Sequence, residues 1–273
     1  MTDFTLIQYQ QLIAALKDAD YLFITFEEFV TKSLQRSVIL RHDIDRHPER
    51  ALKMAELEGK LGVIASYHFR IGKGSNDPDV IRKIKQLGHE VAYHYEDLNR
   101  ALKVGGRFSN HHKEVIEKAI KSFRDNLKYF RQFYPVSIIS MHGDPIHSAD
   151  NRDLWNYFDY RTEGIICEPY LDIDYSTTLY LTDTGRRWNS SGVNIRDKIR
   201  KNYGKTTGEP LRCECRLRST GNLITCLRNG SLPERLILNT HPQRWTNYTI
   251  PWITELLFQN LKNLIKYAIS VGR

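Results

Sequence analysis

The stretch VILRHDIDRHPERA, residues 38–51, begins as an apolar run of strand length and ends in residues typical of a helix start. Two carboxylates and two imidazoles lie between these parts, namely Asp43, Asp45, His42 and His47. A strand that leads directly into a helix is the repeating unit of parallel α/β folds. Such folds place their active sites beyond the carboxyl ends of the strands. The stretch therefore predicts both the fold class and the position of a site.

Apolar runs of strand length alternate with helical patterns along the chain. The expected strands are Ser37–Leu40, Ile64–Phe69, Glu90–Tyr95, Val136–Met141, Gly164–Cys167, Leu179–Leu181 and Arg235–Asn239. Most of the gaps between them carry apolar residues at helical spacing. This alternation predicts a largely parallel sheet with outer helices, and about seven strands fit a closed or nearly closed barrel. An open, doubly wound sheet is the alternative.

A chain of 273 residues can bury one large core, and we expect a single domain over residues 1–273. Residues 1–36 carry a helical stripe followed by YLFITF and are expected to cap one end of the barrel. Residues 184–232 follow the alternation least well, so a loop-rich insertion is expected there.

Hydrophobic residues make up 41% of the chain and charged residues 26%, which is ordinary for a soluble globular protein. No apolar run approaches the ~20 residues that cross a bilayer, and the N-terminus does not resemble a secretory signal. We therefore expect a cytoplasmic protein without a membrane span. The net charge of +8 is most simply a solvated basic surface. It also fits a phosphate-linked sugar substrate, whereas nucleic acid is not expected because no binding signature is present.

The four cysteines are expected to be free thiols, as is usual in the cytoplasm. Cys213 and Cys215 form a C-x-C pair, Cys226 follows further along the chain, and Cys167 stands apart. A zinc site usually shows C-x₂-C pairing and four ligands, and neither is evident here. Ordinary thiols are therefore favoured.

Polar motifs follow most of the expected strands. They are RHDIDRHP (41–48), AYHYED (92–97), MHGDP (141–145), YLTDTGRRW (180–188) and NTHPQRW (239–245). Because the carboxyl ends of parallel strands meet at one end of a sheet, we expect these motifs to form a single site.

The D-x-D pair of the first motif favours a metal ion. Asp43 and Asp45 point to the same side if the strand continues, because side chains alternate along a strand. Two carboxylates this close repel each other unless a cation lies nearby. We therefore expect a divalent metal to bind one of the two carboxylates and leave the other as a base, with a helix-capping role as the alternative for Asp45. His94, after another strand, is of the residue type that most often binds metals.

At these residues the chain resembles the polysaccharide deacetylase superfamily, also called the NodB-homology or carbohydrate esterase family 4-like group. It looks most like a branch associated with surface-polysaccharide biosynthesis. The match runs in motif order from about Val38 to Trp245. The resemblance implies a distorted (β/α)7 barrel that removes acetyl groups from sugars with a divalent metal ion, for which we expect Zn²⁺.

The resemblance also implies residue roles. A base Asp followed by a metal-binding Asp in the family's first motif corresponds to Asp43 and Asp45. GHEVAYHYEDL (88–98) is similar to the second motif and implies that His94 is the first metal-binding His. His241, after the last strand, is similar to the family's general acid.

The chain departs from the family pattern in two places. The second metal-binding His would fall at Leu98, which cannot bind a metal, and MHGDP replaces the Arg-Pro-rich third motif. We expect His142 to be the third ligand. Glu96 is the alternative ligand, but it lies ~6.6 Å further along the strand than His94.

Guanidinium groups suit phosphate or carboxylate, and indole rings can stack on sugars. The residues expected to bind substrate are Asp144, Arg186, Arg187, Trp188, Arg244 and Trp245. The expected function is metal-dependent hydrolysis of an acetyl-like group from an amino sugar or saccharide. A catalytically inactive sugar-binding relative, or a barrel hydrolase acting on another amide or a phosphoester, are the alternatives.

Overall fold

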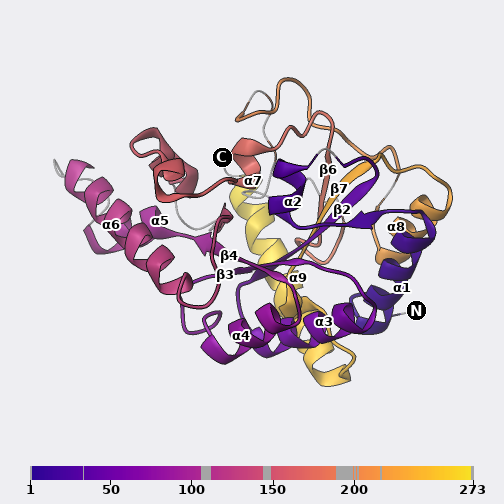
Figure 1. Ribbon diagram of the computed structural model, residues 1–273. Helices are drawn as coiled ribbons and strands as arrows, with labels where there is room; N and C mark the ends of the chain where they lie inside the picture. The colour runs from indigo at the N-terminus through magenta and orange to yellow at the C-terminus, as the bar shows by residue number, and fades with distance from the viewer. Residues whose placement is uncertain are drawn as a thin grey trace.

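The computed structural model describes residues 2–32, 34–105, 112–143, 149–188, 199, 201, 203–215 and 217–271. The strands are β1 (Leu22–Phe23), β2 (Ser37–Ile44), β3 (Ser66–Phe69), β4 (Glu90–Tyr95), β5 (Ile139–Met141), β6 (Leu179–Thr182) and β7 (Arg235–Thr240). The α-helices are α1 (Leu6–Asp18), α2 (Phe26–Thr31), α3 (Pro48–Lys60), α4 (Pro78–Gln86), α5 (Asp97–Gly105), α6 (His112–Phe130), α7 (Pro169–Asp172), α8 (Thr220–Arg228) and α9 (Thr249–Val271). Figure 1 shows their arrangement.

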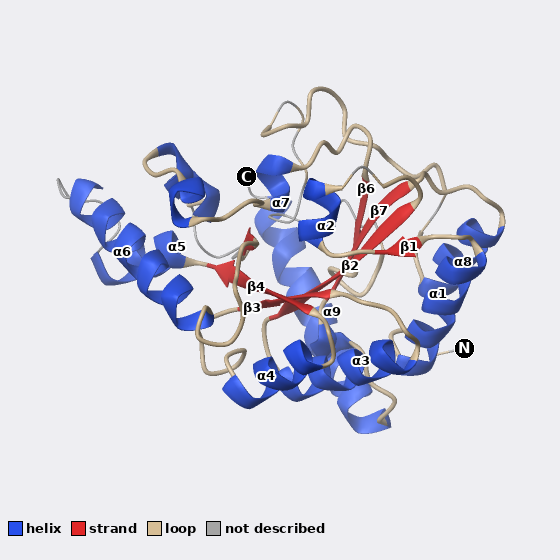
Figure 2. Cartoon of the chain, viewed as in Figure 1, coloured by secondary structure: helices blue, strands red, loops and turns tan. Residues whose placement is uncertain are grey.

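The strands form one curled parallel sheet flanked by helices (Figure 2), which confirms the predicted α/β class. Its order is β5-β4-β3-β2-β7-β6, and β1 pairs with β2 at Leu22 and Phe23. The sheet forms a half-barrel, and no strand pair closes it into a ring within the described residues. The expected strand Gly164–Cys167 makes only a single bridge, from Cys167 to Ile138 beside β5.

The N-terminal region, expected to be a cap, contributes directly to the sheet and its packing. β1 extends the sheet beside β2, and α1 lies against α8 (Figure 1). Residues 184–232, expected to be loop-rich, contain α8 and lack strands of the sheet in their described part. No helix among the described residues is long and apolar enough to span a membrane.

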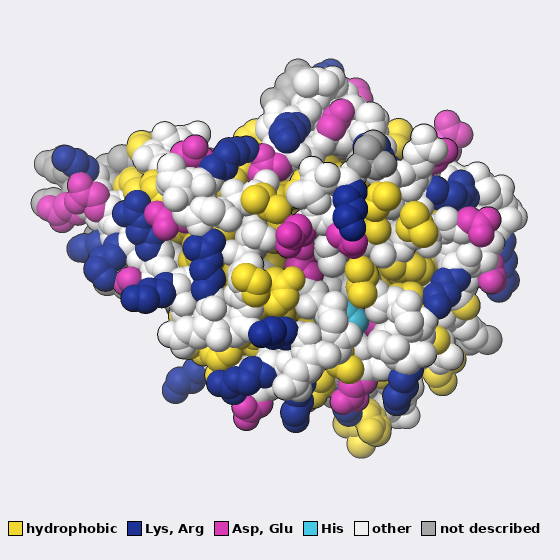
Figure 3. Space-filling model, viewed as in Figure 1, with side chains coloured by type: hydrophobic (Ala, Val, Ile, Leu, Met, Phe, Trp, Pro, Cys, Tyr) yellow, Lys and Arg dark blue, Asp and Glu magenta, His cyan; other side chains and the backbone are white. Residues whose placement is uncertain are grey.

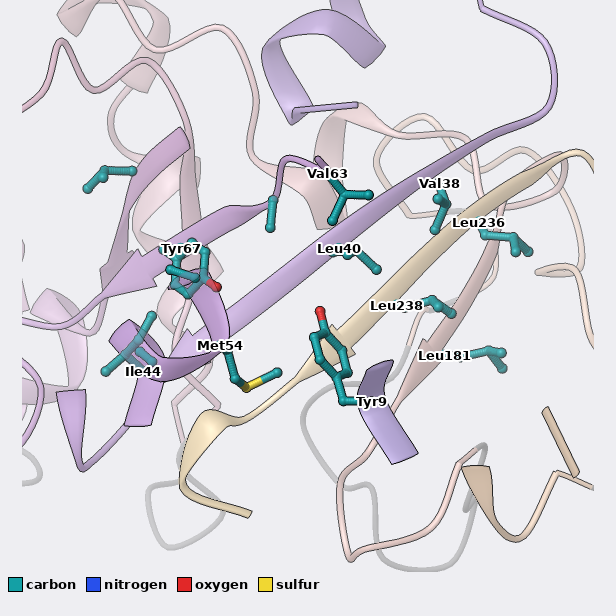
Figure 4. Packing of buried hydrophobic residues seen from close by; sticks show 14 of the residues in the cluster. Tyr9, Val38, Leu40, Ile44, Met54, Val63, Tyr67, Leu181, Leu236 and Leu238 are labelled. Atoms are coloured by element: carbon teal, nitrogen blue, oxygen red, sulfur yellow. The ribbon is translucent and has the colours of Figure 1, made fainter. Parts of the chain in front are cut away.

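The two faces of the sheet carry different side chains because residues alternate along each strand. On one face Val38 and Leu40 pack with Tyr9 of α1 and Met54 of α3 (Figure 4). The opposite, inner face has its own apolar cluster, which includes Ile39, Ala92, Ile138 and Ile237. Ile39, Ala92 and Ile237 lie in β2, β4 and β7, and Ile138 directly precedes β5, so these residues form an apolar layer inside the half-barrel.

Polar residues follow this apolar layer toward the carboxyl ends of the strands. On β2 the inner face continues from Ile39 to Arg41 and Asp43, all completely or almost completely buried. The neighbouring strand β7 continues in the same register, with Asn239 beside Arg41. The inner face therefore changes from apolar to charged within a few residues. A polar site can form at this carboxyl-terminal part of the inner face.

The turn from β2 into α3 leaves Asp45 available for the site. Pro48 is the first residue of α3, where its fixed φ and missing N–H cost nothing. The residue at the N-cap is His47, with a left-handed φ of 60°, and it makes no side-chain capping bond. Asp45 is therefore not the cap of this helix, and the capping alternative is wrong.

Acidic and basic side chains are interspersed over the face of the molecule shown in Figure 3. This mixture agrees with the scattered basic residues of the sequence. The chain's net charge of +8 is not gathered into one basic patch on this face.

Candidate metal centre

Three of the predicted residues come together at the carboxyl ends of three strands. Asp45 follows β2, His94 lies in β4, and His142 follows β5. Each offers a ligand atom, and these atoms all lie within 4.8 Å of one another. The rings of His94 and His142 are nearly perpendicular, at 87°, with centroids 5.3 Å apart. The set expected from the sequence is thus the set that the fold assembles.

The carboxylate of Asp45 contains a buried atom without a hydrogen-bond donor. This atom, Oδ1, lies 3.4 Å from Nε2 of His142 and 3.8 Å from a guanidinium nitrogen of Arg70. Buried polar atoms nearly always have a partner, so a carboxylate oxygen without a hydrogen bond among imidazole nitrogens fits a ligand set for a cation. One carboxylate and two imidazoles are also the donors found in catalytic zinc sites. The residues present therefore fit a divalent metal ion.

Hydrogen bonds set the orientation of His94. Its Nδ1 lies 3.1 Å from the backbone oxygen of Ser140, which can only accept, so Nδ1 carries the proton. Burial lowers the pKa of His94 to about 4, which keeps the ring neutral. Nε2 therefore has a free lone pair, 3.8 Å from Oδ2 of Asp43. The hydroxyl of Ser140 also bonds with Nδ1 of His68 at 2.7 Å, which holds Ser140 in place.

Glu96 lies on the Nδ1 side of the His142 ring, whereas Asp45 lies on its Nε2 side. Its Oε2 is 3.4 Å from Nδ1 of His142, and its two oxygens accept from Arg70 at 2.6 Å and Arg100 at 2.9 Å. Burial raises the pKa of Glu96, but the contacts with His142 and Arg70 outweigh it and hold the pKa well below its usual range. Glu96 is thus committed to arginines, and it lies close to His142 on the side away from Asp45. Leu98, at the position of the family's second metal-binding His, is buried in an apolar cluster.

Asp43 is buried and held by strong donors. Arg41 donates to both of its oxygens, at 2.8 and 2.9 Å, and Asn239 donates to Oδ2 at 2.9 Å. Burial raises the pKa of Asp43, but Arg41, His94 and His68 outweigh it and hold the pKa well below its usual range. Asp43 is therefore ionised. Three donors leave one of its roughly four acceptor positions free.

His241 is paired with Asp183. Nδ1 of His241 donates to Oδ1 of Asp183 at 2.7 Å, and its backbone N–H donates to Oδ2 at 3.0 Å. Its Nε2 therefore faces the site, 3.9 Å from Oδ2 of Asp45. Burial and Arg244 lower the pKa of His241, but Asp183 and Asp45 outweigh them and raise it. A histidine with a raised pKa beside a metal ligand set is suited to act as an acid.

Asp183 was not predicted from the sequence, although it follows β6 at the same kind of strand end as Asp45 and His142. This position directly after a strand is the feature of the sequence that could have identified Asp183 as a site residue. Two further residues were also missed, of which Gln243 lies within the motif NTHPQRW and Arg70 lies outside the quoted motifs. Gln243 donates to Oδ2 of Asp45 at 3.3 Å, and Arg70, after β3, contacts both Asp45 and Glu96.

The two predicted stacking residues lie in the hydrophobic core. Trp188 and Trp245 are each 1% exposed. The indole N–H of Trp245 donates to Asp183 at 2.8 Å, and that of Trp188 donates to Thr220 at 3.1 Å. Neither ring presents a face to a ligand in this structure, and Trp245 instead supports the Asp183–His241 pair.

The three arginines predicted to bind substrate, Arg186, Arg187 and Arg244, differ in their contacts and exposure. Arg244 forms an ion pair with Asp183. Arg186 lies over the rings of Phe4 and Trp252, at 4.9 and 4.8 Å. Arg187 is exposed. Asp144, the remaining predicted substrate contact, lies outside the described residues.

The other imidazoles of the opening motif do not join the site. His42 lies on the outer face of β2, where its ring nitrogens bond with Thr240 at 2.6 Å and Glu58 at 2.7 Å. His47 is exposed and contacts Glu49 at 3.0 Å. Both are structural features of the strand–helix turn.

No family model matches the chain, and the comparison with curated proteins finds no match either. The geometry of the site therefore carries the functional inference that follows.

Removing the charge of Asp183 is expected to destabilise the fold. Asp183→Asn leaves Arg244 and His241 without their buried anionic partner, which typically costs about 3 kcal/mol or more. Burial raises the pKa of Asp183, but Arg244 and His241 outweigh it and lower it to about 2. Its ionisation therefore stabilises the fold above pH ~4, and this contribution is lost as the pH falls through ~2.

Urea unfolding of the wild type and variant, between pH 7 and pH 2, measures this effect. The control is Asp125→Asn, which removes an exposed carboxylate paired with Lys121 and should change the free energy of unfolding by less than ~0.5 kcal/mol. Equal stability of Asp183→Asn and wild type at pH 7 would show that the pair does not hold His241.

Proposed function

We propose that the protein is a metal-dependent hydrolase of the polysaccharide deacetylase type, which removes an acetyl-like group from an amino sugar or saccharide. One observation carries the proposal. The candidate ligands Asp45, His94 and His142 lie next to an ionised carboxylate, Asp43, and a histidine with a raised pKa, His241. In this proposal the curled sheet is the observed part of a distorted (β/α)7 barrel.

The three ligand residues would hold a divalent ion, with Zn²⁺ the expected metal. Three protein ligands and one open position are the usual arrangement of catalytic zinc. When bound, the ion supplies Lewis acidity toward the acyl carbonyl and the attacking water. Ser140 contributes by fixing the orientation of His94, and Glu96 places a carboxylate 3.4 Å from Nδ1 of His142.

Asp43 would accept the proton of the attacking water. Arg41 and Asn239 orient its carboxylate and keep it ionised, and one acceptor position remains for the water. The residue lies on the inner face of β2, with Oδ2 3.8 Å from Nε2 of His94, so it is next to the proposed ion.

His241 would donate a proton to the departing amine or alkoxide. Its Nδ1 is committed to Asp183, so Nε2 is the atom that delivers the proton. Asp183 also accepts from Trp245, which fixes the carboxylate at the end of β6. The roles of Asp43 and His241 are thus separated, because their surroundings lower the pKa of Asp43 and raise the pKa of His241.

The substrate class rests on the resemblance and on the charge of the chain. Arg187 is the predicted arginine that is exposed, and it is the candidate for contact with a phosphate-linked sugar. Purified protein reconstituted with Zn²⁺ is assayed for acetate release from nucleotide-linked N-acetyl sugars and from O-acetylated sugars. Metal-dependent acetate release supports the proposal.

Two other outcomes overturn it. Sugar binding and full metal content without acetate release would indicate an inactive binding relative. Release of phosphate or opening of another amide, without acetate, would indicate a different hydrolase.

A further inference from the structure

A cavity outside the metal centre lies on the outer side of the sheet, where α1 and α3 pack. It has a volume of about 340 Å³, and residues of α1, α3 and the start of α9 line it. These three helices lie near one another in Figure 1. Ligand cavities in proteins typically measure ~300–1,000 Å³. This cavity therefore suits a small ligand, about the size of one substituted ring, and not a polymer.

Gln243 separates the cavity from the metal centre. Its backbone oxygen accepts a hydrogen bond at 2.5 Å from Arg50, which lines the cavity. Its side chain instead donates to Oδ2 of Asp45, a candidate metal ligand, at 3.3 Å. The two ends of Gln243 thus face different sites, and a molecule in the cavity is not a ligand of the metal centre.

Two basic side chains on the cavity wall lack an acidic partner. Arg50 and Lys53 are three residues apart in α3, so they lie on the same face of the helix. In the described part of the chain, Arg50 contacts the backbone of Gln243, Lys53 lies 4.8 Å from the centroid of the Tyr248 ring, and neither forms an ion pair. Like charges at this spacing destabilise a helix. An anion bound to both residues would remove this repulsion.

The rest of the lining adds apolar and aromatic surface and one carboxylate. The apolar residues include Leu6 and Pro251. Tyr248 is 63% exposed, so its ring is accessible to a ligand. The carboxylate is that of Glu49, which lies 3.0 Å from Nδ1 of His47. The lining therefore combines a net positive charge with apolar surface, which suits an anionic group attached to a ring.

We propose that this cavity binds a small phosphate-bearing ligand of the phosphorylated-monosaccharide class. Arg50 and Lys53 would bind the phosphate, because guanidinium and ammonium groups both donate charge-assisted hydrogen bonds to phosphate oxygens. The ring of Tyr248 and the apolar wall would contact the sugar. The site is separate from the metal centre, and it does not depend on the proposed hydrolase activity.

Calorimetric titration of the metal-free full chain with glucose 1-phosphate tests this site separately from the catalytic one. Without a bound ion, the phosphate group cannot bind to a metal at the other centre. We expect saturable binding to a single site, weaker binding of inorganic phosphate and no binding of glucose. The affinity for glucose 1-phosphate should fall as the salt concentration is raised, because the charges of the site are partly exposed and are screened by salt.

Lys53→Gln should weaken the binding of glucose 1-phosphate by ~10-fold, the effect of losing a hydrogen bond to a charged group. The side chain is exposed, so the variant should retain the fold, which circular dichroism checks. Lys53→Arg keeps the charge and should bind like the wild type. The matched control is Lys60→Gln, which removes an exposed lysine from the last turn of the same helix and should leave binding unchanged.

Four results would overturn the proposal. The first is the absence of glucose 1-phosphate binding to the wild type, and the second is binding of glucose that is as strong. The third is equal affinity in Lys53→Gln and the wild type, which would place the ligand elsewhere. The fourth is an equal loss in Lys53→Gln and Lys60→Gln, which would indicate an effect of net charge instead of a site.

Discussion

His94→Ala is expected to abolish metal binding at the candidate centre and to reduce turnover to background. His94 presents Nε2 as a neutral ligand because its Nδ1–H donates a hydrogen bond to the backbone oxygen of Ser140. Alanine leaves only Asp45 and His142, and two ligands rarely retain a catalytic zinc ion. The loss of turnover should exceed the ~10²–10⁴-fold that a general base contributes. Metal content by mass spectrometry and acetate release measure the two effects.

The matched control is His47→Asn. It removes an imidazole from the same strand–helix turn, and asparagine tolerates the left-handed φ of 60° at this position. His47 is exposed and is not a ligand, so both metal content and turnover should be unchanged. Full metal content at this centre in His94→Ala would remove the assignment of His94.

Asp43→Asn is expected to lower turnover by ~10²-fold or more while metal binding is retained. The amide preserves the shape of the side chain but cannot accept the proton of the attacking water. Arg41 also loses its ionic partner, so turnover is expressed per folded molecule, with the folded fraction taken from circular dichroism.

Asp45→Asn provides the comparison for this prediction. It makes the same chemical change two residues away, but it removes a ligand, so metal should be lost together with turnover. If Asp43→Asn also loses the metal, Asp43 is itself a ligand, and another group must act as the base.

The sequence predicted the strand ends of the site well, because a strand that leads into a helix imposes the position of the side chains that follow it. Asp45, His94 and His142 could be found in this way. The motif after β6 was also predicted to belong to the site. Its arginines and tryptophan were expected to bind substrate, and no role was predicted for Asp183. Whether a carboxylate at a strand end turns toward a histidine on the next strand depends on tertiary packing.

The remaining differences also arise from contacts that are distant in the sequence. Trp188 and Trp245 follow strands, yet both rings are buried because α1, α8 and the N-terminal segment cover them. The expected strand Gly164–Cys167 makes only one bridge.

The central claim is that one divalent ion is bound by Asp45, His94 and His142. Crystals of the zinc-loaded protein, measured on both sides of the zinc absorption edge, locate such an ion directly. We predict an anomalous peak about 2.0–2.2 Å from Nε2 of His94, Nε2 of His142 and a carboxylate oxygen of Asp45. A peak at this centre with His142 more than ~4 Å away, beyond any zinc–nitrogen bond, would contradict the claim and make Glu96 the ligand to test.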